Sequence, residues 1–414
     1  MRRALLTTLS LTFCAFGASA AMACTAADVS GPGNAVRTAR AALMRVPVGG
    51  MDTSVPLDAQ RAIETVKDRI IAFVTTALRC TDRSTAPATI QSFLAAQGDA
   101  FEDRTVYTQQ NPGRDMHGDG LAYEVAAVAQ HPDLLGVVAR LNIECGQDAV
   151  LLLFQRAETG WQLRMVRRSG PYRDISGANG GFDYAVSPAD AQGRWYVATA
   201  RIPPWCSSAW SALYYDLARP TADPAAPDIF FRKATGLYSG FDDSFGLHVA
   251  ADSLQVEHDA GYFDPAILVR RHVETYRVDG DTVRRIAPVA FNARDFVDEW
   301  MDLDWPEASA WTANVPRLAE LHRRLAASNN GRPYLEQGPI HRCASDLHQI
   351  EVDAFDREAG GANRRQATYY FLVRGKGPYR LEDVRPGPLT ACGGPDLGAA
   401  IEQANTRERE RRGD

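Results

Sequence analysis

Apolar residues recur at helical spacing in the first part of the chain, between Asp58 and Leu78. The positions that repeat are Ile63, Val66, Ile70, Val74 and Ala77. This spacing places them on one face of an amphipathic helix. A shorter pattern predicts a second helix over Ala88–Gln97, and the Gly- and Pro-rich lead-in before them allows a short helix over Asn34–Met44. We therefore expect a helical N-terminal region.

After Gly120 the pattern changes to the period of β-strands. Four apolar runs separated by short polar turns predict a meander: Leu121–Val128, Leu134–Ile143, Ala149–Arg156 and Trp161–Arg168. The following stretch, Ser169–Asp190, is rich in Gly, Ser and Pro, and we expect it to be an exposed loop.

Further strand patterns continue to Pro288. They cover Arg194–Ile202, Trp210–Leu217, Gly246–Ala250, Leu254–His258, Ile267–Val278 and Thr282–Pro288. Both faces of the Trp210–Leu217 run are apolar, which predicts a strand buried on both sides. Asp279-Gly280 has the composition of a tight hairpin turn.

The last part of the chain mixes both periods. Helix patterns cover Ala293–Met301, Val315–Ala327 and a charged terminal segment from Leu397, and strand patterns cover His348–Phe355, Ala367–Val373 and Tyr379–Val384. Asp302–Asn314 between two of these helices reads as a Trp-rich connection.

These patterns predict an α+β protein that is mainly antiparallel β. We expect a helical region over residues 21–120, a central β-meander of sandwich-like or partial-propeller-like form over 121–301, and an α+β region with a charged tail over 302–414. Ala149–Arg156 also aligns without gaps on Ala367–Arg374, and Trp161 then falls on Tyr379. Either a duplicated hairpin or the shared preferences of strands explains this similarity.

The N-terminus has the three parts of a secretory signal peptide. Arg2 and Arg3 are positive, Ala4–Gly17 is apolar but too short to span a bilayer, and Ala18-Ser19-Ala20 resembles a cleavage site. We therefore predict a signal peptide over residues 1–20, no membrane span, and a periplasmic or secreted protein.

The cysteine count agrees with export. Outside the predicted signal peptide there are six: Cys24, Cys80, Cys145, Cys206, Cys343 and Cys392. An even number in an exported chain predicts disulfides. Sequence alone leaves the connectivity open, and sequential pairing is the simplest choice. Lipid attachment at Cys24 is a less favoured alternative, because it would leave one cysteine without a partner.

The charge of the chain is mildly negative. The formal value is −6, and removal of Arg2 and Arg3 changes it to −8. Such a balance argues against a nucleic-acid partner.

One loop has part of a cation-binding pattern. Asp115 and Asp119, followed by Gly120, match the start of a calcium loop. However, Ala126 occupies the position where that loop carries a bidentate Glu. An acidic turn that leads into a strand is the favoured explanation of these residues, and we expect no cofactor.

A second group of residues offers general acid–base chemistry. Asp243, Glu257 and Glu274 supply carboxylates, and His272 lies two residues before Glu274. A pair of carboxylates at suitable distance can hydrolyse glycosides. In a strand, Glu257 and His258 point to opposite faces, whereas His272 and Glu274 share one face.

Aromatic residues are frequent in the central region. Most of them are expected in the core. Trp205 is the exception, because Pro203-Pro204 and Cys206 fix it in an irregular turn where it can contact a ligand.

The sequence does not identify a family or a ligand. The favoured hypothesis is a non-enzymatic, exported binding or envelope-associated protein, whose partner would be a small molecule, a glycan or a protein. The alternative is an extracytoplasmic hydrolase that uses an Asp/Glu pair within residues 242–274.

Overall fold

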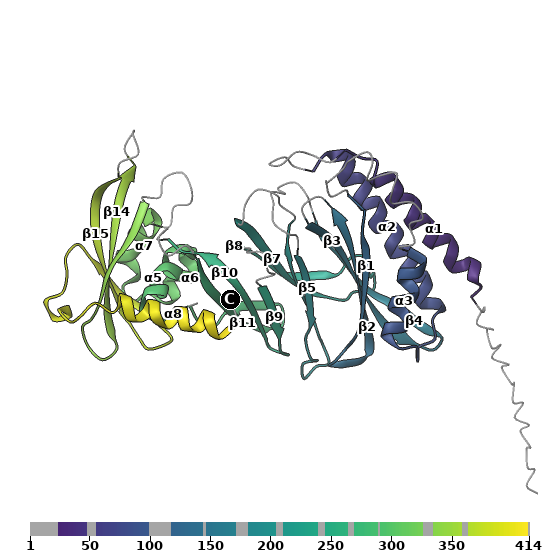
Figure 1. The fold of residues 1–414 in the computed structure, drawn as a ribbon. Helices are drawn as coiled ribbons and strands as arrows, with labels where there is room; N and C mark the ends of the chain where they lie inside the picture. Colours follow the sequence, from purple (N-terminus) through teal and green to yellow (C-terminus); the bar gives the residue numbers. More distant parts are fainter. Residues whose placement is uncertain are drawn as a thin grey trace, which may run out of the picture.

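A computed structural model gives the fold of the chain. It describes residues 24–47, 55–98, 117–143, 146–170, 181–203, 210–238, 245–263, 269–288, 290–325, 334–357 and 363–412. These residues form helices and antiparallel strands in four sheets, which confirms the predicted α+β, mainly antiparallel class. Figure 1 shows the N-terminal helices at one end, stacked sheets in the middle and a mixed α+β part at the other end.

Three helices form the N-terminal layer. They are α1 (Ala26–Leu43), α2 (Leu57–Cys80) and α3 (Pro87–Gly98). The predicted apolar stripe of α2 is buried. α1 begins well before the predicted Asn34, because Thr25 and Asp28 form a capping box at its start. A disulfide between Cys24 and Cys80 joins the start of α1 to the end of α2.

The first sheet contains the predicted four-stranded meander. Its strands are β1 (Leu121–Val128), β2 (His131–Ile143), β3 (Gly146–Ala157) and β4 (Gly160–Arg168). Val150, Leu152 and Phe154 of β3 pack against the helices. Leu151 and Leu153 pack against the second sheet. The continuous apolar run of β3 is therefore explained by burial on both faces.

The second sheet follows the same meander order. Its strands are β5 (Gly181–Val186), β6 (Val197–Ile202), β7 (Trp210–Arg219) and β8 (Asp228–Tyr238). The prediction of Ser169–Asp190 as a loop is wrong for the part that forms β5. This strand is short and begins at a glycine, so its pairing with β6 rather than its own composition stabilises it. β8 was not predicted either.

The prediction that the strand at Trp210 is buried on both sides is also wrong for one of its two faces, where Ala212 and Tyr214 are only partly buried. The Trp210 side chain is 43% exposed, and it packs on Tyr238 of the neighbouring strand. Leu213, Tyr215 and Leu217 further along β7 are buried. The aromatic composition of this strand therefore reflects both a core and an exposed end.

The third sheet packs on the other face of the second. Its strands are β9 (Phe245–Val249), β10 (Ser253–Gly261), β11 (Val269–Asp279) and β12 (Thr282–Arg285). Leu254, Val256 and Tyr276 join the core that the second sheet supplies. Asp279 pairs with Thr282 across the turn, and Gly280 has a φ of 59°. The predicted Asp279-Gly280 hairpin is thus confirmed.

The C-terminal part combines helices with the fourth sheet. Its elements are α5 (Ala293–Asp302), α6 (Trp305–Ala310), α7 (Val315–Leu325), β13 (Tyr334–Arg342), β14 (Leu347–Arg357), β15 (Asn363–Arg374), β16 (Arg380–Arg385), η1 (Thr390–Cys392) and α8 (Gly398–Arg412). α6 lies inside the segment predicted as a connection, because Asp304 caps its start. Trp300 is fully buried between the helices and this sheet. Cys343 and Cys392 form a disulfide.

The two disulfides are pairs that sequential pairing predicts, and Cys145 and Cys206 lie outside the described residues.

α1–α3 share a core with the first sheet, and α5–α7 share one with the fourth. The predicted domain boundaries after residues 120 and 301 stay predictions. In the described part of the chain, no helix has the length and apolar character needed to cross a membrane.

The first and fourth sheets also bear on the predicted duplication. β3 and β15 are each the third strand of their sheet. A bulge interrupts the next pairing in both cases, at Arg164 in β4 and at Glu382 in β16. The gapless alignment places these two residues opposite each other, although the ladders around them differ by one residue. Duplication remains a prediction.

Candidate functional site

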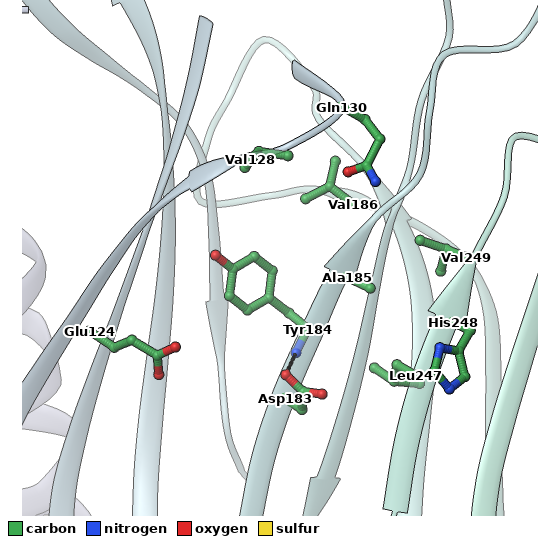
Figure 2. A pocket seen from close by; sticks show the side chains of 10 residues that line it. All are labelled: Glu124, Val128, Gln130, Asp183, Tyr184, Ala185, Val186, Leu247, His248 and Val249. Atoms are coloured by element: carbon green, nitrogen blue, oxygen red, sulfur yellow. Dashed lines mark hydrogen bonds between the residues drawn. The ribbon is translucent and has the colours of Figure 1, made fainter. Parts of the chain in front are cut away.

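The chain order of the sheets brings three edge strands together. β1, β5 and β9 are each the first strand and an edge strand of their sheet. A groove of about 450 Å³ lies along them (Figure 2). Its lining residues are Glu124, Val128, Gln130, Asp183, Tyr184, Ala185, Val186, Leu247, His248 and Val249. We refer to this surface as the edge-strand groove.

Glu124 supplies one carboxylate of the groove from β1. Arg140 of β2 donates from Nη2 to Glu124 Oε2 at 3.3 Å, and from Nη1 to the carbonyl oxygen of Phe182 at 2.9 Å. The Arg140 side chain therefore connects the first sheet to β5. It also compensates the charge of Glu124 at the mouth of the groove.

Asp183 and Tyr184 lie at the centre of the groove, on β5. Asp183 Oδ1 accepts a hydrogen bond from the backbone N–H of Tyr184 at 2.7 Å, drawn as a dashed line in Figure 2. Burial raises the pKa of Asp183 above its ordinary value and raises the pKa of Tyr184 to about 12. The Tyr184 phenol therefore keeps its proton at neutral pH and can donate to a ligand.

Gly136 of β2 makes room for the Tyr184 ring. A Cβ at position 136 would lie 2.0 Å from Tyr184 Oη and 2.9 Å from its Cζ. Only glycine lets the two sheets approach this closely here. The position of the phenol in the groove thus depends on a residue of the neighbouring sheet.

We expect Gly136→Ala to lower the free energy of unfolding by about 1–3 kcal/mol, the usual cost of overpacking. Urea unfolding would measure the change. In a Tyr184→Phe background the cost should be smaller, because the hydroxyl oxygen nearest to the new methyl group is absent. An equal cost in both backgrounds would show that Tyr184 is not the residue displaced.

A second polar group of residues is fully enclosed between the third sheet and α5. Arg270 is bonded to Asp298 and Glu299, and Arg285 is bonded to Glu299 and, at 2.7 Å, to Glu274. All five side chains are at most 6% exposed. Burial acts to raise the pKa of Glu274, but the charges of Arg285 and Lys233 outweigh it and lower that pKa to about 2. We call these residues the buried ionic cluster.

Two histidines adjoin this cluster. His258 of β10 and His272 of β11 are directly opposite each other in the ladder, with ring centroids 5.1 Å apart. Both are buried, and none of their four ring nitrogens has a hydrogen-bond partner among the described residues. Burial lowers the pKa of His258 to about 4 and that of His272 well below its ordinary value. Both rings are therefore neutral at pH 7.

The structure separates some of the acids that the sequence suggested as catalytic. Val256 is opposite Glu274 in the ladder, so Glu257 points to the other face of the sheet. There Glu257 accepts hydrogen bonds from Arg271 at 2.9 Å and Gln255 at 2.7 Å. His272 and Glu274 share one face, as predicted, and His258 joins them.

The other suggested residues are only partly described. Asp243, Trp205 and Asp115 lie outside the described residues. Asp119 precedes β1, at the end of the segment that follows Asp115. The predictions of a catalytic Asp243, a ligand-binding Trp205 and a cation between Asp115 and Asp119 therefore remain predictions.

The residues of the edge-strand groove were missed in the sequence. Asp183 and Tyr184 fall in the stretch expected to be a loop, and Glu124 and His248 lie in ordinary strand patterns. The only sequence feature that could have indicated these residues was their position in the first strand of each predicted meander. If the chain forms successive meanders, the first strands of neighbouring sheets can lie side by side.

Comparisons with known proteins do not assign the chain to a family. No protein-family model matches it, and no curated protein sequence matches it. Among solved structures, a complex of BT0996 and RGII is 11% identical with a TM-score of 0.23, and the match covers 69% of this chain and 79% of the other. MPT-4, a mannose phosphorylase from Leishmania mexicana, is 11% identical with a TM-score of 0.20, covering 70% and 78%. Both TM-scores are too low to indicate a shared fold.

Proposed function

We propose that the chain is an exported, non-enzymatic binding protein, and that the edge-strand groove holds a small ligand rich in hydroxyl groups, such as a saccharide. One observation carries the proposal. Five polar residues from the edges of three sheets line one opening: Glu124, Gln130, Asp183, Tyr184 and His248. Convergent polar groups in a concave surface are the usual mark of a ligand site.

The kinds of polar groups favour hydroxyls over ions. Carboxylates accept hydrogen bonds, a phenol and an amide both donate and accept, and a hydroxyl group can satisfy each of them. Arg140 compensates the charge of Glu124. With Asp183, the groove and its border hold two carboxylates against one guanidinium group, which disfavours an anionic ligand.

The state of the two carboxylates favours binding over catalysis. Glu124 is paired with Arg140, and Asp183 accepts the N–H of its own strand. A hydrolase needs one carboxyl group free to act as an acid and a second as base or nucleophile. The hydrolase alternative among Asp243, Glu257 and Glu274 has the further difficulty that Glu257 and Glu274 lie on opposite faces of the third sheet.

Two features support the export part of the proposal. Cys24–Cys80 and Cys343–Cys392 are disulfides, which persist in oxidising compartments and are rare in the cytosol of most organisms. The N-terminal sequence has the pattern of a signal peptide.

The test is calorimetric titration of the mature protein with a panel of mono- and oligosaccharides. Asp183→Asn and Tyr184→Phe should each weaken binding about 10-fold or more, since one hydrogen bond to a ligand is worth about 1–2 kcal/mol. Glu158→Gln is the matched control, because Glu158 is an exposed carboxylate in the β3–β4 turn, outside the groove.

Two outcomes would contradict the proposal. The first is that no saccharide binds at millimolar concentration, or that both groove variants bind as well as the wild type. The second is the release of reducing sugar from a bound oligosaccharide over hours, since this would make the protein an enzyme.

A further inference from the structure

Within the described residues, the ring nitrogens of the two buried histidines have no hydrogen-bond partner. Cross-strand pairs in a sheet core are normally apolar, and a buried polar group without a hydrogen bond destabilises the folded state. Here the four imidazole nitrogens of His258 and His272 are buried without a hydrogen-bond partner in the described part of the chain. If these histidines served only to fill space, an apolar side chain of similar size would do so without burying polar nitrogens. Two such residues facing each other therefore need another explanation.

Glu274 completes a set of metal-ligand types around these rings. One ligand atom from each of His258, His272 and Glu274 lies within 4.8 Å of the others. The hydrogen bonds that Glu274 accepts from Tyr215, Tyr276 and Arg285 all end on Oε2. The second carboxylate oxygen, Oε1, is the one that would face an ion. Two imidazoles and a carboxylate are ligands that zinc takes in proteins.

We propose that His258, His272 and Glu274 bind a divalent transition metal, with zinc as the first choice, within the β10–β11 ladder of the third sheet. Ligands of tetrahedral zinc bonded at about 2.0–2.1 Å lie about 3.4 Å apart. The three ligand atoms would need to approach one another by up to about 1.4 Å (4.8 Å minus 3.4 Å), which side-chain rotation can supply. Glu299 Oε2 lies 3.9 Å from His272 Nδ1, in position to give a fourth ligand.

Neighbouring side chains surround Glu274 and orient its carboxylate. The buried ionic cluster holds three carboxylates, Glu274, Asp298 and Glu299, against two guanidinium groups, Arg270 and Arg285. Lys233 Nζ lies 3.9 Å from Glu274 Oε2 and balances the third carboxylate, so an ion would be held chiefly by the two imidazoles and Glu274 rather than by an excess of negative charge. Tyr215 donates to Glu274 from the second sheet at 2.7 Å and orients it.

The enclosed position indicates a structural role. His258, His272, Glu274 and Glu299 are all buried, so four protein ligands would leave no open coordination position for a substrate. Metal bound here would join β10 and β11 to each other and, through Tyr215, to the second sheet. This site is independent of the edge-strand groove and would be present whether or not the groove binds a saccharide.

The test uses the mature protein stripped with a chelator and then loaded with Zn²⁺ alone. We expect one zinc per chain after desalting, a higher thermal unfolding temperature, and an X-ray absorption spectrum that fits two imidazoles and oxygen ligands. The spectrum needs no variant, so it remains informative even where a substitution prevents folding. Absence of retained zinc, or a bound zinc without imidazole ligands, would overturn the proposal.

Variants then locate the site. His258→Gln and His272→Gln should weaken zinc binding by more than about 100-fold, because loss of an outer-shell partner alone costs about 10–100-fold. Tyr215→Phe should show that smaller loss. His348→Gln, a half-buried histidine of β14, is the control and should bind zinc like the wild type. Equal loss in the His348 variant, or none in the two ligand variants, would refute the assignment.

Discussion

Replacing Lys67 by Met should lower the free energy of unfolding by about 3–5 kcal/mol at pH 8, because it leaves a buried carboxylate without its cation. Lys67 Nζ lies 3.0 Å from Asp148 Oδ2, and the two side chains are 1% and 0% exposed. Lys67 also donates to the carbonyl oxygen of Ser169 at 2.8 Å. Lys67 of α2 thus neutralises the Asp148 carboxylate of β3 and also binds the backbone at Ser169, just after β4.

The loss should depend on pH in a defined direction. Burial raises the pKa of Asp148 to about 6, and the Lys67 charge acts against that rise. Without Lys67 the folded-state pKa should be higher still, while the unfolded value stays near 3.8. Between these values the folded state binds a proton that the unfolded state does not. Stability of the variant therefore falls as pH rises, and its deficit should be smaller at pH 5 than at pH 8.

Urea unfolding at both pH values measures this effect. Arg61→Met is the control on the same helix, because the Arg61–Asp58 pair is 76% and 84% exposed and should contribute at most about 1 kcal/mol. The double variant Lys67→Met/Asp148→Leu should recover most of the loss. A deficit that is the same at both pH values would mean that the ionisation of Asp148 does not cause the loss.

Arg285→Met should also cost about 3–5 kcal/mol, for a related reason. Arg285 lies between Glu274 and Glu299 and is 3% exposed. Its removal would leave two carboxylates near each other in the core, with only part of their charge compensated by Arg270 at Glu299 and by Lys233 at 3.9 Å from Glu274. The carboxylates of Glu274 on β11 and Glu299 on α5 would then repel each other where Arg285 now joins them.

Urea unfolding in the presence of a chelator would measure the Arg285 effect without a contribution from metal. Arg317→Met is the matched control: Arg317 pairs with Asp383 at the surface, and its side chain is half exposed. We expect a loss of at most about 1 kcal/mol there. If the two variants lost the same stability, the buried ionic cluster would have no special role.

The sequence predicted those elements whose own periodicity decides their structure. α2 has a long apolar stripe, and the Asp279-Gly280 turn requires a residue with positive φ, so both were recognised. β5 and β8 were missed because neighbouring strands stabilise them. Their polar residues and glycines look like a loop until the strand beside them is known.

The site residues divide in the same way. The shared face of His272 and Glu274 follows from strand alternation, and it was predicted. That His258 lies opposite His272 depends on the register of two strands, which the sequence does not determine. The edge-strand groove is harder still to predict from sequence, because it depends on how three separate sheets pack against one another.

The order of strands has a consequence for the making of the protein. Every sheet consists of four strands that are consecutive in the chain, so each sheet can pair as soon as its own residues have emerged during synthesis or secretion. α1–α3 precede the first sheet and already supply its core. We therefore expect a folding path that proceeds from the N-terminus one sheet at a time, with each finished sheet serving as the template surface for the next.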